Sequence, residues 1–277
     1  SELAEQINHY QEILQENPSD ANTWHKLGNC FITQGDNKQA ISAYEHAIQL
    51  DPNYMIAWYN LGVALNADHN IDNAIKAFRQ AIHIDSTYIN AWLNLGLLLR
   101  NTHDIEGAIA IYRQALEIDP KNVHLWSNLA SAILAKGDYE EAISAYRQAI
   151  ELDPTYTNAW NNLGVALNSM GDIEGAITAF RRVLELDPGY NDALNNLGVS
   201  LKAKNDIDGA IDAFERVTKL VPTYAKAWFN LGVALQLKGN YERSRDAFDK
   251  ALKIDPNLSK SPLLDDEIRF NQKKIDM

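Results

Sequence analysis

The sequence predicts an all-α protein made of repeated helical hairpins that stack on one another. Three patterns predict it: a tryptophan position that recurs every 34 residues, a leucine three residues after it, and a small residue followed by an aromatic ring four residues later. Spacings of three and four place side chains on one face of a helix, and a strict period indicates a repeat architecture. The recurring positions are Trp24, Trp58, Trp92, Trp126, Trp160, Leu194 and Trp228.

Composition argues for a folded chain and against several classes of function. Of the 277 residues 46% are hydrophobic, but a mean hydropathy of −0.33 and the lack of a long apolar run argue against a membrane span. The net charge of −12 opposes the phosphate neutralisation on which binding to DNA or RNA depends. The stretch SELAEQINHYQEILQ does not resemble a signal peptide. We therefore expect a cytoplasmic protein with neither a nucleic-acid partner nor direct membrane insertion.

The first helix of each unit carries the tryptophan, the leucine, a glycine and a later apolar residue on one side. The glycine, replaced only by Ala130, allows a neighbouring helix to approach closely. The helix has to end where four units have glycine and the others have His69, His103 and Asn205. Glycine, and less readily His or Asn, adopts the left-handed backbone that ends helices. We interpret the two histidines as helix terminators rather than as metal ligands.

The second helix begins after an Asp or Asn that follows each of these turns and is a good N-cap. It then carries the small residue and the aromatic ring. A proline closes every unit except one, where Ser86 stands, and we expect it in the loop before the next first helix or in the first turn of that helix. The aromatic residues are Tyr44, Phe78, Tyr112, Tyr146, Phe180, Phe214 and Phe248.

The ends of the chain depart from the pattern. One hairpin cannot bury its own apolar side, so stability comes from stacking, and we expect a single domain over residues 1–277. Seven repeats cover residues 21–258, and residues 1–20 fit only the second half of a unit. Residues 259–277 do not continue the repeat, and we expect a C-terminal capping helix there, over roughly 262–275.

The pattern W..LG, then A...F, then P resembles the tetratricopeptide repeat (TPR) family over nearly the whole chain. The resemblance implies a right-handed α-α superhelical solenoid whose first helices line a concave groove, the usual partner site in the family. The array is closest in style to that of O-GlcNAc transferase. The family's clamp for chaperone tails also uses Lys and Arg, which are missing here: the corresponding positions hold His25 and Asn29, then Asn60, then Asn90 and Asn94.

Motifs of catalysis are absent from the sequence. It contains no HExxH, no glycine-rich phosphate loop and no GxSxG. Most acidic residues recur at fixed positions of the repeat, which indicates a structural role. Cys30 stands where other units have a small or apolar side chain, and we expect it to be packed. We therefore predict that the chain is not an enzyme and has no catalytic residue, metal site or cofactor.

The side of the first helix opposite the tryptophan is the candidate binding surface, and by resemblance it lines the groove. Two residues after the tryptophan position the chain has asparagine in six units and Lys26 in the first. A carboxamide offers a donor and an acceptor and could hold an extended peptide, or it could bond within its own repeat. The six asparagines are Asn60, Asn94, Asn128, Asn162, Asn196 and Asn230.

Aliphatic residues stand on the same side, five residues after the tryptophan position. They predict an exposed apolar strip of the kind that marks partner sites, and the rival interpretation is partial burial between adjacent first helices. These residues are Val63, Leu97, Val165, Val199 and Val233.

Charge and variability complete this surface. Its cations outnumber its acid, which favours a neutral to acidic peptide. The residue directly after the tryptophan position varies most and would carry selectivity; Asn161 and Asn195 occupy it in two units, and Asn158 faces the same wall. The charged residues are Lys26, Arg100, Lys202 and Lys226 against Asp192.

These observations favour a non-enzymatic scaffold, such as an assembly or adaptor factor. It would bind an extended segment or a short helix of a partner protein in the groove. Two alternatives stay open: a structural array that associates with itself, and the regulatory TPR region of a glycosyltransferase-like protein.

Overall fold

A computed structural model describes residues 2–260, 274 and 275. The chain divides into two compact units, Ser1–Lys136 (unit 1) and Gly137–Met277 (unit 2), and each is described by itself. The described residues contain α-helices and one short 3-10 helix, and no strand occurs among them. The predicted all-α fold is confirmed.

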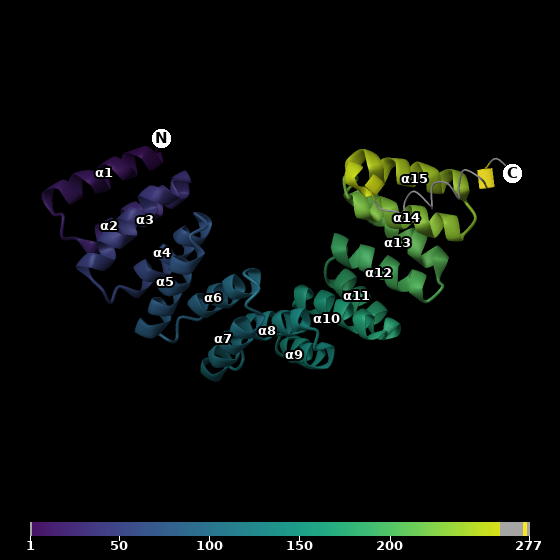
Figure 1. Ribbon diagram of the computed structural model, residues 1–277, viewed down its shortest axis with the longest axis horizontal. Helices are drawn as coiled ribbons and strands as arrows, with labels where there is room; N and C mark the ends of the chain where they lie inside the picture. Colours follow the sequence, from purple (N-terminus) through teal and green to yellow (C-terminus); the bar gives the residue numbers. More distant parts are fainter. Residues whose placement is uncertain (1, 261–273, 276–277) are drawn as a thin grey trace. The chain divides into compact units, whose positions relative to one another are not determined.

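Unit 1 consists of one lone helix followed by helical hairpins and the first helix of a further pair (Figure 1). Its helices are α1 (Glu2–Glu16), α2 (Ala21–Gln34), α3 (Asn37–Leu50), α4 (Met55–Ala67), α5 (Ile71–Ile84), α6 (Ile89–Asn101), α7 (Ile105–Ile118) and α8 (Val123–Lys136).

Unit 2 continues the alternation of first and second helices. Its elements are α9 (Tyr139–Leu152), α10 (Thr157–Met170), α11 (Ile173–Leu186), α12 (Asn191–Ala203), α13 (Ile207–Leu220), α14 (Ala225–Leu237), α15 (Tyr241–Ile254) and the 3-10 helix η1 (Pro256–Lys260).

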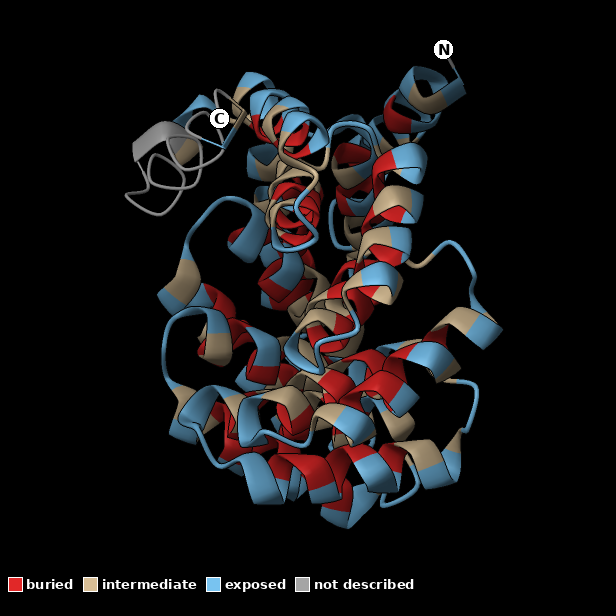
Figure 2. Cartoon of the chain, turned by 90° about the vertical axis from the view of Figure 1, so that its right-hand side faces the viewer, coloured by how far each residue is buried: buried red, intermediate tan, exposed pale blue. Residues whose placement is uncertain are grey.

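Helices pack mainly on their neighbours in sequence. Within each unit a first helix packs on its own second helix, as α2 does on α3 and α14 on α15, and on the second helix of the preceding repeat, as α4 does on α3. Successive first helices also touch: α6 contacts α8, α10 contacts α12, and α12 contacts α14. Buried residues accordingly lie on the helix sides that face other helices (Figure 2). This is the packing of a TPR solenoid.

The recurring glycine lies against the recurring aromatic ring. A Cβ added to Gly28 would lie 2.5 Å from Tyr44 Cε1, and one added to Gly198 would lie 2.6 Å from Phe214 Cε1. Both rings are at most 1% exposed. The expected close approach is therefore confirmed, and it occurs between the two helices of one hairpin.

The turn between the helices has the expected left-handed backbone. His69, His103 and Asn205 have φ values of 60°, 66° and 68°. The next residue then caps the second helix; for example, Asp104 accepts a hydrogen bond from the Gly107 N–H at 2.9 Å. Asn70 is an exception to the predicted caps, because its side chain makes no capping hydrogen bond.

The tryptophan and the preceding proline are linked by a hydrogen bond. The indole N–H of Trp24 donates to the Pro18 carbonyl at 2.9 Å, and Trp228 donates to the Pro222 carbonyl in the same way. In the unit with Ser86, Trp92 donates to the Ser86 carbonyl, so the bond requires only a backbone oxygen. The prolines lie in the loops, as expected.

At the chain ends the sequence is only partly covered. Helix α1 matches the predicted second half of a unit. The predicted capping helix over 262–275 lies outside the described residues, apart from Lys274 and Ile275. The capping helix and the single domain therefore stay predictions.

Candidate functional site

The six recurring asparagines lie on the first helices, and we call the side of these helices that carries them the ladder face. Five of the six are half-buried, and Asn230 is 8% exposed. On the same face Val63 and Leu97 are 37% and 39% exposed, whereas Val165, Val199 and Val233 are half-buried. The apolar strip is therefore more open in unit 1 than in unit 2.

In unit 1 the first asparagine joins two repeats. Asn60 Nδ2 donates to His25 Nε2 at 2.9 Å and to Asn29 Oδ1 at 3.2 Å. Asn29 Oδ1 also accepts the Tyr44 hydroxyl proton at 2.7 Å. The other imidazole nitrogen of His25 lies 3.2 Å from the Tyr54 hydroxyl oxygen. Both hydrogens of the Asn60 amide are thus used between the first and second repeats.

The imidazole of His25 stays uncharged in this network. Burial, and secondarily the charge of Lys26, lowers the pKa of His25 below its ordinary value. The neutral form is also the one that fits, because Nε2 has to accept the proton that Asn60 donates.

The next two asparagines bond to helix backbone. Asn94 Nδ2 donates to the Asn90 carbonyl at 2.9 Å and to the Tyr59 hydroxyl oxygen at 3.1 Å. Asn128 Nδ2 donates to the His124 carbonyl at 2.8 Å. Each NH₂ group therefore points to its own helix, and that of Asn94 also bonds to the preceding repeat.

In unit 2 the asparagines pair with one another. Asn230 Nδ2 donates to Asn195 Oδ1 at 2.9 Å, and Asn161 Nδ2 lies 3.4 Å from Asn162 Oδ1. Asn161 and Asn195 are only 8% and 1% exposed. The expectation that Asn161, Asn195 and Asn230 face an open groove is wrong for these side chains. They are buried because successive first helices contact each other in this unit.

One rule relates these contacts to the sequence. An asparagine of the ladder bonds to the residue 35 positions earlier, as in Asn60 with His25, Asn94 with Tyr59 and Asn230 with Asn195. The rule depends on a polar residue at the earlier position. The position 35 before Asn128 is Leu93, and Asn128 bonds only to its own helix.

A row of tyrosines was missed by the sequence interpretation. Tyr190 donates to Asn158 Oδ1 at 2.8 Å, and Tyr224 donates to Asp192 Oδ1 at 3.0 Å, each across 32 residues to the preceding repeat. Burial, and secondarily the bond to Asp192, raises the pKa of Tyr224 to about 12. The signal was the recurrence of tyrosine every 34 residues, at Tyr54, Tyr88, Tyr156, Tyr190 and Tyr224.

The predicted cations are largely available on the surface. Lys26 and Lys226 are exposed, while Arg100 and Lys202 are half-buried. Among the described residues, Lys26, Arg100 and Lys226 form no ion pair. Asn29, Asn90 and Asn158 are also exposed.

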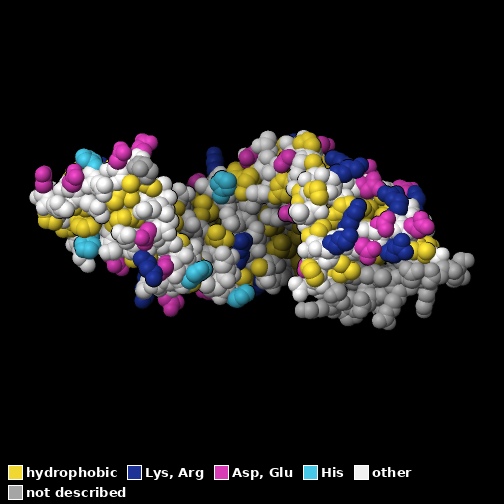
Figure 3. Space-filling model, turned by 90° about the horizontal axis from the view of Figure 1, so that it is seen from above, with side chains coloured by type: hydrophobic (Ala, Val, Ile, Leu, Met, Phe, Trp, Pro, Cys, Tyr) yellow, Lys and Arg dark blue, Asp and Glu magenta, His cyan; other side chains and the backbone are white. Residues whose placement is uncertain are grey.

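Other charges form ion pairs between repeats. Lys136 lies 2.8 Å from Glu106, Lys204 lies 2.6 Å from Glu174, and Lys238 pairs with Asp208. In Figure 3 acidic and basic side chains lie side by side over α13–α15. These pairs stabilise stacking and do not mark a site.

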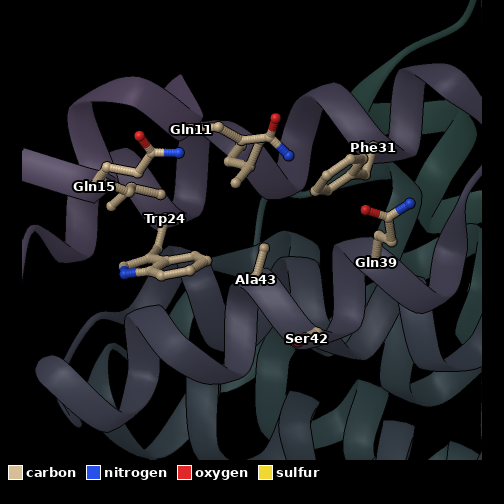
Figure 4. A pocket seen from close by; sticks show the side chains of 9 residues that line it. Gln11, Gln15, Trp24, Phe31, Gln39, Ser42 and Ala43 are labelled. Carbon is tan, nitrogen blue, oxygen red and sulfur yellow. The ribbon is translucent and has the colours of Figure 1, made fainter. Parts of the chain in front are cut away.

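Two hollows in unit 1 lie between second helices. The first, of about 500 Å³, has Trp24 and Phe31 among its lining residues, together with the amides of Gln11, Gln15 and Gln39 (Figure 4). The second measures about 730 Å³. Each lining residue of the first recurs 34 positions later in the second. The hollows therefore follow from the repeat geometry and not from a feature of one place.

Other kinds of site find no support in the part of the chain that the structure describes. It contains no group of three or more His, Cys, Asp or Glu side chains placed to hold a metal. Cys30 is buried, in line with the packing role expected for it. None of the described helices has the length and apolar character needed to cross a bilayer.

Comparison with known proteins agrees with this geometry. Models described as TPR repeat or tetratricopeptide repeat match residues 28–68, 65–133, 130–171, 157–190 and 195–259. No curated protein matches the chain by sequence.

Three solved structures illustrate the similarity. A crystal structure of MamA is 30% identical, with a TM-score of 0.55, over 60% of this chain and 97% of that one. YrrB, described as a TPR protein with an unusual peptide-binding site, is 26% identical, with a TM-score of 0.55, over 69% and 96%. A chain of the APC/C hetero-tetramer Cut9–Hcn1 shares the fold at 17% identity and a TM-score of 0.67, over 97% and 52%. The chain belongs to the tetratricopeptide repeat family.

Proposed function

We propose that the protein is a non-enzymatic interaction scaffold that binds a segment of a partner protein on its ladder face. The observation that carries the proposal is the coexistence on one face of exposed aliphatic side chains, Val63 and Leu97, with the unpaired cations Lys26 and Arg100. Exposed apolar side chains rimmed by polar groups usually mark interaction sites.

The surface favours a neutral to acidic segment. The chain carries a net charge of −12, yet the ladder face of unit 1 has Lys26 and Arg100 without acidic partners. Complementary charge speeds association and disfavours basic partners. The structural similarity to YrrB, a protein described by its peptide-binding site, is consistent with a peptide ligand.

A pair of double variants tests this function. Val63→Ser with Leu97→Ser removes the apolar strip of unit 1. Leu50→Ser with Ile118→Ser is the matched control, because these side chains are 42% and 39% exposed at the ends of second helices of the same unit. Peptides of about twenty residues, a length near that of one interface side, are selected from a random library on the wild-type protein. Affinities for the three proteins are then measured.

The ladder-face variant should bind the selected peptides about tenfold more weakly, equivalent to about 1.4 kcal/mol, while the control stays close to the wild type. The proposal fails if both variants bind alike, or if the library yields no peptide that depends on the ladder face.

A further inference from the structure

The amides of the ladder in unit 1 have a fixed orientation. A backbone carbonyl is only an acceptor, so the amide atom that contacts it has to be the NH₂ group. Asn94 contacts the Asn90 carbonyl at 2.9 Å, and Asn128 contacts the His124 carbonyl at 2.8 Å. The chemistry of these partners settles the usual ambiguity between the nitrogen and oxygen of an amide.

The same orientation holds for Asn60. Its NH₂ group faces Asn29 Oδ1, which already accepts the proton of the Tyr44 hydroxyl, and His25 Nε2. A reversed amide would place two carbonyl oxygens against each other. The NH₂ groups of Asn60, Asn94 and Asn128 are therefore all occupied inside the unit.

Three carbonyl oxygens remain for an outside molecule. Among the described residues, Oδ1 of Asn60, Asn94 and Asn128 accepts no hydrogen bond. The three side chains are half-buried, so they still reach the surface. The ladder face of unit 1 thus presents acceptors, and a ligand has to supply donors.

This polarity distinguishes an extended segment from a helix. In an α-helix the backbone N–H groups past the first turn donate to carbonyls of the same helix and cannot donate outward. An extended segment has N–H groups free to donate to another chain. Its side chains can then reach the two cations of this face, Lys26 and Arg100.

We propose that unit 1 binds an acidic peptide in extended conformation. Its backbone N–H groups donate to the side-chain oxygens of Asn60, Asn94 and Asn128, and its carboxylates lie near Lys26 and Arg100. This inference rests on the proposed function and adds the conformation and hydrogen-bonding polarity of the ligand.

Ester substitution in the ligand tests the inference. The probes are acidic peptides selected from the random library on the wild-type protein and resynthesised with one backbone amide at a time replaced by an ester. An ester lacks the N–H but adds no bulk. At the contacting positions the wild type should lose about three- to tenfold in affinity, the range for one net hydrogen bond.

A double-mutant cycle assigns the lost bond. The variant Asn94→Leu with Asn128→Leu should bind the same ester peptides no worse than the parent peptides, because the acceptor is already gone. Circular dichroism confirms that the variant is folded, and the ester series on the wild type needs no variant at all. Peptides that depend on Val63 and Leu97 but tolerate every ester would overturn this inference and leave the proposed function intact. Peptides indifferent to Val63 and Leu97 would instead overturn the proposed function.

Discussion

Nε2 of His25 accepts a hydrogen bond from Nδ2 of Asn60 at 2.9 Å, and this contact links the first repeat to the second. The imidazole also lies beside the Tyr54 hydroxyl, with its ring centroid 5.9 Å from that of Tyr44, and Lys26 is its charged neighbour. Protonation of Nε2 would place two donors against each other.

The junction of the first two repeats should therefore weaken in acid. The pKa of His25 is lowered in the folded state from an ordinary 6.5, so the unfolded chain binds this proton more readily. Stability from the neutral imidazole is complete above pH 6.5 and is lost as the pH falls through the lower folded pKa. Hydrogen exchange of α2 and α4 should accelerate between neutral and acidic pH in the wild type, and less in His25→Gln. An equal acceleration in both proteins would contradict this role of His25.

Closing the space beside the buried rings should destabilise the fold. In Gly198→Ala the new Cβ would lie 2.6 Å from Phe214 Cε1, and the ring has no room to move because it is 0% exposed. Overpacking of this kind costs about 1–3 kcal/mol. Urea unfolding should show this loss for Gly198→Ala. The control is Gly189→Ala, whose nearest neighbour would be 3.5 Å away, and an equal loss there would refute the packing argument.

A missing ion pair can be restored in unit 2. Lys204 pairs with Glu174 and Lys238 with Asp208, both 30 residues apart, but Met170 stands 30 residues after Glu140 and is 47% exposed. Met170→Lys should raise the free energy of unfolding by about 0.2–1 kcal/mol at low salt, and the gain should fade at high salt. Met170→Gln, measured beside it, should show no such salt dependence. If it gains as much, the pairing is not the cause.

The left-handed turn constrains position 69. His69 has φ of 60°, a conformation that Asn tolerates and a β-branched residue does not. His69→Val should cost about 1–3 kcal/mol, whereas His69→Asn should be nearly neutral, as thermal unfolding can show. Equal stability of the two variants would show that the turn relaxes to another backbone.

The sequence predicted the fold well because each repeat restates the same local rules. The glycine faces the ring, the histidines end helices and the prolines lie in loops, and each of these depends on neighbours within one or two helices. Seven copies of a pattern make such local interpretations secure.

The state of the ladder amides could not be predicted in the same way. Whether Asn60 is bonded depends on His25, 35 residues earlier, and on how closely two first helices approach. Asn195 is buried for the same reason, although its sequence position matches that of the half-buried Tyr59. The residue 35 positions earlier is the signal that could have identified these bonds.

The most direct test of the ladder face is the affinity of a selected acidic peptide for the wild type and for Asn94→Leu with Asn128→Leu, measured by calorimetry. We predict about tenfold weaker binding in the variant at unchanged helical content, from the loss of two acceptors. Equal affinities would show that the oxygens of these asparagines do not hold the ligand.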